Sequence, residues 1–220
     1  MKNLFYSLTL VCLLSTSASA VHLNHTFDAS YGANKDSFTH SLSYKPMVGF
    51  FESSAWKIGV GARYTGFIGG SGVDYERADS AYKSSNSYEL TVPDARVYSL
   101  NAIFETTYTF WNKLEVGLNI DLIGYGVGTD RVGNYTSPNA GASGAATSEV
   151  PAFNLLLLGK HDKGQLNSEI FVGYRFNQNL GVRAGLSHLI TEHKATTNLE
   201  GENRFRHLGY FPFASVNYTL

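Results

Sequence analysis

The chain has 220 residues, a length suited to one domain, and its 17 basic and 18 acidic side chains give a net charge of -1 at pH 7. Such a balance provides no basic surface for a phosphate backbone, so we expect no nucleic-acid partner. The single cysteine excludes an internal disulfide.

The N-terminus has the three parts of an export signal. Lys2 is positively charged, residues 4–14 form an apolar segment, and residues 18–20 read Ala-Ser-Ala, a small-x-small cleavage site. We therefore expect residues 1–20 to be a cleaved signal peptide. The mature protein is then a single domain that covers residues 21–220.

The chain lacks the other common membrane signals. Cys12 lies within the expected signal, and Thr9, Leu10 and Val11 before it do not supply the small residue that lipoprotein cleavage requires. Beyond the signal, the longest aliphatic run is the four leucines at 155–158, far below the roughly 20 apolar residues of a membrane helix. If the mature chain crosses a membrane, it does so with strands.

Eight segments alternate apolar and polar residues over about ten positions, the pattern of a strand whose two faces meet lipid and lumen. In the fourth segment, for example, Leu100 and Phe104 alternate with Asn101 and Glu105. The eight segments cover residues 21–31, 38–45, 56–65, 98–110, 114–122, 166–176, 180–190 and 208–220.

The strand number is supported by parity. Residues 153–158 could form a ninth strand, but the leucines within this segment are apolar on both faces. A bacterial barrel has an even number of strands, short periplasmic turns and long external loops. The short turns at 111–113 and 177–179 fall on the periplasmic side only if residues 153–158 lie within a loop. We therefore expect eight strands.

Aromatic residues cluster at both ends of these segments, as in the two aromatic girdles of a membrane barrel. The alternative is that Tyr and Phe are simply common in strands. The expected periplasmic girdle contains Trp56, Phe110, Trp111, Phe176 and Tyr218, and the outer girdle contains Tyr31, Tyr64, Tyr98 and Tyr210.

The export signal, the alternating strands, the short inner turns and the long outer loops resemble the small eight-stranded outer-membrane barrels, the OmpA-type and OmpX-type proteins. The resemblance covers the whole mature chain, although the last residue is Leu220 where that group usually has Phe. It implies an all-β, eight-stranded antiparallel transmembrane β-barrel in the outer membrane of a Gram-negative bacterium, reached after export to the periplasm. It also implies a monomer that meets the barrel assembly machinery, outer-membrane lipid and lipopolysaccharide.

The polar register places five positive and five negative charges in the lumen. The positive side chains are Lys45, Lys57, Arg63, Arg175 and Arg183, and the negative ones are Asp28, Glu105, Glu115, Asp121 and Glu169. An eight-stranded barrel is only wide enough for its own side chains, and charges in such an interior are costly unless they pair. A selective pore would be lined by one sign. The balance therefore favours a closed barrel with internal ion pairs.

Glycines in the same register have two interpretations. They make room for long arginine side chains, or they leave a thin water path. The residues concerned are Gly59, Gly61, Gly117, Gly173, Gly181 and Gly185.

Function is expected in the external loops at 69–95, 127–164 and 192–206, because loops on a rigid barrel commonly carry binding specificity. The alternative is that these loops are only solvated surface. The leucines at 155–158 should be covered by other loops, by the barrel mouth, by a partner or by lipid. The leading hypothesis is a non-enzymatic barrel with a structural or surface-binding role towards an unknown extracellular ligand. The alternatives are a small passive pore for ions or small solutes and a lipid-modifying enzyme.

No catalytic residue, cofactor or metal is predicted. A lipid A deacylase has a His and a Ser two residues apart on the lipid face, whereas His40-Ser41 and Ser187-His188 point to opposite faces. An acyltransferase needs an acyl-sized cavity, which ten lumen charges oppose. The remaining candidate metal ligands, His161, Asp162, His188, Glu192 and His193, match no metal-binding spacing.

A small basic cluster lies on the last external loop. It contains Lys194, Arg204, Arg206 and His207. The alternatives are an ordinary solvated loop or a contact with the anionic sugars and phosphates of lipopolysaccharide.

Overall fold

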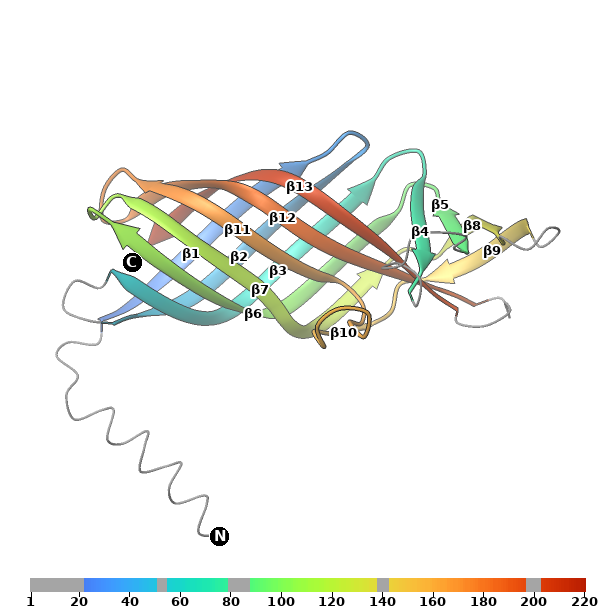
Figure 1. Cartoon of the computed structure of the whole chain (residues 1–220), viewed down its shortest axis with the longest axis horizontal. Coiled ribbons are helices and arrows are strands. Elements are labelled where there is room, and N and C mark those ends of the chain that lie inside the picture. The colour runs from blue at the N-terminus through green and yellow to red at the C-terminus, as the bar shows by residue number, and fades with distance from the viewer. Residues whose placement is uncertain (1–21, 51–54, 79–87, 138–142, 197–202) are drawn as a thin grey trace, which may run out of the picture.

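The computed structural model describes residues 22–50, 55–78, 88–137, 143–196 and 203–220, so the expected signal peptide lies outside the described residues. Within these ranges the chain forms one antiparallel sheet of 13 strands (Figure 1). No helix in the described part of the chain is long and apolar enough to span a membrane.

Eight long strands form a closed barrel. They are β1 (His22–Ala33), β2 (Ser37–Phe50), β3 (Trp56–Gly69), β6 (Arg96–Phe110), β7 (Leu114–Gly128), β11 (Leu166–Arg175), β12 (Leu180–Ala195) and β13 (Arg204–Thr219). Each pairs with the next in this order. The ring closes between β1 and β13, where Ala29 pairs with Val216. This confirms the predicted eight-stranded class.

The exterior of the barrel is apolar. Large side chains such as Leu100, which is 60% exposed, and Ile170, which is 65% exposed, project from the wall, while Asn101 and Glu105 point inward and are buried. Such a surface is unsuited to water and matches the lipid-facing band of a membrane barrel. The protein is therefore a transmembrane β-barrel of the outer-membrane type.

A bulge in β7 changes the predicted alternation. The pairing of β6 with β7 shifts register between Ala102 and Ile103, so Leu122 is the extra residue. Beyond it, Ile123 and Tyr125 point outward. Beyond a bulge, the residues that face the lipid change from even to odd positions, so simple alternation could be followed only as far as residue 122.

Four short strands build a folded extension on the outer end of the barrel. They are β4 (Val73–Arg77), β5 (Glu89–Val92), β8 (Arg131–Thr136) and β9 (Ser143–Glu149). Pairing runs from β13 to β4, β5, β8 and β9 and returns to β12, so the six strands close a second ring. Figure 1 shows these strands beyond the barrel, where β12 and β13 extend to meet them.

The extension corrects the expectation that residues 69–95, 127–164 and 192–206 are loops. Much of the described part of each segment is strand, although residues 79–87, 138–142 and 197–202 lie outside the description. The alternation was present but short: in β4, Val73 and Tyr75 are buried whereas Asp74 and Glu76 are exposed.

The prediction that residues 153–158 lie within a loop was wrong for three of them. Residues Phe153–Leu155 form β10, which pairs with Ile123, Gly124 and Tyr125 of β7. Because β11 begins only at Leu166, β10 occupies the place beside β7 that β11 leaves open. It adds no strand to the closed ring, so the even count holds.

Candidate functional site

The inner half of the lumen is occupied by ion pairs around Arg183 on β12. Its guanidinium lies 3.2 Å from the Asp28 carboxylate, 3.1 Å from that of Glu105 and 2.6 Å from that of Glu115. Lys45 pairs with Asp28 and, at 2.5 Å, with Glu105. We call these five residues the Arg183 cluster. Two cations thus serve three acids, of which Glu105 and Glu115 are buried and Asp28 is half-buried.

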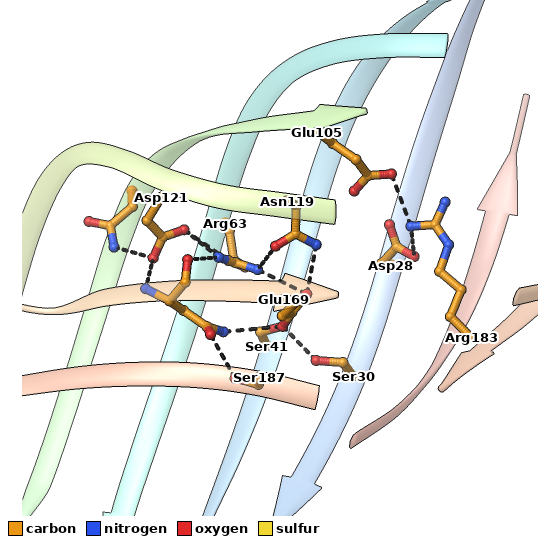
Figure 2. A network of polar contacts seen from close by, with 12 residues as sticks. Asp28, Ser30, Ser41, Arg63, Glu105, Asn119, Asp121, Glu169, Arg183 and Ser187 are labelled. Atoms are coloured by element: carbon orange, nitrogen blue, oxygen red, sulfur yellow. Dashed lines mark hydrogen bonds and ion pairs between the residues drawn. The ribbon is translucent and has the colours of Figure 1, made fainter. Parts of the chain in front are cut away.

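A second group surrounds Arg63 on β3 and lies nearer the outer end. Arg63 contacts the carboxylates of Asp121 at 2.6 Å and Glu169 at 3.0 Å, and it donates to the side chain of Asn119. Figure 2 shows these side chains converging from different strands. Asn101 and the backbone N–H of Asn167 complete the hydrogen bonding of Asp121. We call Arg63, Asp121, Glu169 and their amide partners the Arg63 cluster.

The two clusters leave almost no free space between them. The cavity that they line has a volume of about 10 Å³, close to the minimum for one water molecule. Several lumen-facing glycines make room for side chains: a Cβ on Gly117 would lie 2.6 Å from Cζ of Phe171, and one on Gly173 would lie 3.1 Å from Cγ of Arg183. At Gly61 the Cβ would first meet the backbone oxygen of Tyr44, at 2.0 Å. Of the two interpretations of these glycines, the geometry favours room for large side chains.

Two of the ten predicted lumen charges do not join either cluster. Lys57 and Arg175 line a wide opening of about 690 Å³ at the periplasmic end, together with Lys113 and His22. Arg175 donates to the backbone oxygen of Gln178 at 3.3 Å. Among the described residues, neither cation forms an ion pair with an acid. Alternation along β3 and β11 places both side chains on the lumen face, but they lie at its periplasmic end, away from the two clusters.

An apolar core fills the outer mouth of the lumen and continues into the extension. Phe67, Val97, Leu189 and Phe211 point inward from the barrel strands. They form one buried cluster with extension residues, among them Tyr75, Leu90, Val92, Tyr135 and Phe205. Ion pairs therefore occupy the inner part of the lumen, and apolar side chains occupy its outer mouth.

The predicted basic cluster is largely internal. Arg206 is buried, and Glu192 accepts hydrogen bonds from Arg206 at 3.2 Å and from Arg204 at 2.8 and 2.7 Å. Lys194 is exposed and lies 3.7 Å from Glu149. His207 contacts the backbone oxygen of Asp74, and burial lowers its pKa. Contact with lipopolysaccharide stays a hypothesis, which on this geometry depends on Lys194 and the exposed edge of Arg204.

The structure also joins a serine and a histidine that sequence spacing did not connect. Oγ of Ser148 lies 3.2 Å from Nδ1 of His193 inside the extension. Both side chains are wholly buried, and burial lowers the pKa of His193 to about 4. A nucleophile and base need access to substrate. This pair has none, so it acts as packing.

The other histidines and acids do not gather. Among the described residues, no group of three or more His, Cys, Asp or Glu side chains could hold a metal ion. His161 and Asp162 are adjacent in sequence, but His161 is exposed and Asp162 is buried.

No protein-family model and no curated protein sequence matches the chain. Among solved structures, it is similar to the Neisserial surface protein A, with 13% identity and a TM-score of 0.43 over 89% of this chain and 96% of that one. It is also similar to Ail, the attachment invasion locus protein of Yersinia pestis, solved with the heparin analogue sucrose octasulfate. The identity is 12% and the TM-score 0.36, over 90% of this chain and 97% of that one. The N-terminal β-barrel domain of Pseudomonas aeruginosa OprF is 11% identical, with a TM-score of 0.31 over 91% of this chain and 100% of that one. Identities this low leave the function to be argued from the residues of this chain.

Proposed function

We propose that the protein is a non-conducting, non-enzymatic outer-membrane barrel that holds a rigid binding module outside the cell. The observation that carries the proposal is the filled interior: two ion-paired clusters with about 10 Å³ between them, below a continuous apolar core. A pore needs a continuous polar path of one charge preference. This interior supports the closed alternative over the passive pore.

The extension supports the second half of the proposal. Its strands share a buried core with the barrel, so the outward side chains are held in fixed positions. On β8, Val132, Asn134 and Thr136 are exposed, and Asp74 and Glu76 on β4 are exposed as well. A preorganised surface loses less conformational entropy on binding than a flexible loop does. The module is therefore suited to recognition of an extracellular ligand.

Solute flux tests the first half. Vesicles that contain the refolded protein and an entrapped small dye should retain the dye as well as protein-free vesicles do. Dye loss that scales with the amount of folded barrel would overturn the proposal and favour the passive pore.

Surface substitutions test the second half. A Val132→Asp, Thr136→Arg variant changes exposed side chains and leaves the core intact, so it should fold normally. Protein in lipid nanodiscs should bind a panel of extracellular polysaccharides, matrix proteins or intact cells, and this variant should bind at least one of them more weakly. Failure of the native protein to bind any surface would leave a purely structural role.

A further inference from the structure

The loop between β10 and β11 exposes two leucines beside the barrel wall. Leu157 is 46% exposed and Leu158 is 76% exposed. Basic residues follow in the same loop: Lys160, His161 and Lys163 are all exposed. We call residues 156–164 the leucine loop. Its composition is an apolar tip with a basic collar.

The loop is held at a defined height on the barrel. The backbone N–H of Leu156 donates to the oxygen of Leu122 at 2.8 Å. Tyr98 of β6, a residue of the expected outer girdle, pairs with Val127 of β7. Val127 lies further along β7 from the periplasm than Leu122 does. The loop therefore starts on the membrane side of the outer girdle, next to the exposed side chains of Ile123 and Tyr125. In Figure 1 it curls beside the outer part of β7.

The loop is also built to keep its shape. The buried Asp162 carboxylate accepts the N–H groups of Leu157 at 2.7 Å and Gly159 at 3.2 Å. The backbone oxygen of Asp162 in turn accepts from Arg204 at 2.9 Å and from Arg206. The half-buried Arg204 and the buried Arg206 and Glu192 thus anchor the loop from behind.

Leu158 has a φ of 66°, in the left-handed region that disfavours bulky side chains. Gly159 follows with a φ of 87°, and a Cβ there would meet no atom within 4 Å. A glycine or asparagine at 158 would relieve the backbone strain. The presence of leucine at this position points to a use for its exposed side chain.

We propose that the leucine loop is a membrane anchor, which inserts Leu157 and Leu158 into the outer leaflet and places Lys160 and Lys163 against anionic lipid headgroups. The loop continues the lipid-facing surface of the wall through Ile123, Tyr125 and Phe153, whose ring packs on Tyr125 at 6.4 Å. Burial of apolar area together with attraction to anionic lipid is the physical basis of interfacial anchoring. The anchor would add a lipid contact beside β7, where Leu156 hydrogen-bonds to Leu122.

Depth-dependent quenching tests the proposal directly. The one cysteine, Cys12, lies in the expected signal peptide, so one cysteine introduced into the mature chain permits a single label. An environment-sensitive fluorophore is attached to Leu158→Cys, with Leu157→Cys as a second site if the positive φ impairs folding. Ile170→Cys on the barrel exterior is the lipid control, and Val132→Cys on the extension is the water control. Each protein is refolded into vesicles of phosphatidylcholine that contain phosphatidylglycerol.

The anchor predicts that brominated lipid quenches the label at 158 or 157 as it does at 170, while iodide in the buffer quenches only the label at 132. A Lys160→Glu, Lys163→Glu variant should move the label outward in these vesicles, with weaker bromine quenching and stronger iodide quenching. A label at 158 that behaves like the one at 132 would overturn the proposal. Protection from both quenchers that disappears on dilution of the protein would also overturn it, and would indicate contact with a second copy.

Discussion

Replacement of Arg183 by alanine probes the ion pairs that fill the inner lumen. Arg183 contacts three acids, and Glu115 forms no other ion pair among the described residues. Loss of the guanidinium leaves Lys45 to serve Asp28 and Glu105 and leaves Glu115 unpaired. Breaking a buried pair in this way costs about 3–5 kcal/mol of unfolding free energy. The lost packing on Phe171, whose ring lies 4.4 Å from Cζ of Arg183, adds to the cost.

The measurement is urea unfolding of the refolded protein in lipid vesicles, followed by the fluorescence of Trp56 and Trp111, the two tryptophans. Arg175→Ala is the matched control, because Arg175 lies at the open mouth, and it should change stability by no more than about 0.5 kcal/mol. An added Glu115→Gln should restore part of the loss in the Arg183→Ala protein. A loss below about 1 kcal/mol for Arg183→Ala would refute the argument that these buried pairs sustain the barrel.

Three further outcomes follow from the extension. Burial holds the pKa of His193 at about 4, below its ordinary 6.5, so between about pH 6.5 and 4 this side chain takes up a proton only in the unfolded chain. The extension should therefore lose about 3 kcal/mol of unfolding free energy over that window, measured by hydrogen exchange. His193→Gln should remove this dependence of stability on pH. Phe205→Ala removes a fully buried ring from the core and should cost about 3–5 kcal/mol, seen as rapid proteolysis of the extension while the barrel resists; equal resistance of both would contradict the shared core. Arg206→Ala should cost about 3–5 kcal/mol, whereas Lys194→Ala, on an exposed pair, should cost less than about 1 kcal/mol; the reverse order would show that the assigned burial is wrong.

The barrel was predictable because its strands are long and face lipid on one side. Alternation over a long strand such as β6 fixes which residues face outward, and parity then fixes the number of strands. The extension was not predictable in the same way. Strands such as β5, with four residues, give too little alternation to distinguish from a loop, and their partners are distant in sequence.

The lumen charges were identifiable from their register, but their partners were not. Arg63 and Asp121 lie 58 residues apart, and only strand pairing brings them together. Arg204 and Arg206 followed a loop in the sequence and were interpreted as surface residues. Arg206 is buried and Arg204 is half-buried, and both donate to backbone oxygens of the leucine loop, contacts that no local pattern signals.

Single-channel conductance in a planar lipid bilayer tests the central claim, that the lumen is sealed twice. We predict that the refolded native protein shows no discrete current steps. Arg63→Ala should also be silent, because it disrupts only the Arg63 cluster and leaves the Arg183 cluster below it and Phe67 and Phe211 above it. Steps in the native protein would contradict the account, and steps that first appear in Arg63→Ala would show that the apolar core does not close the outer mouth.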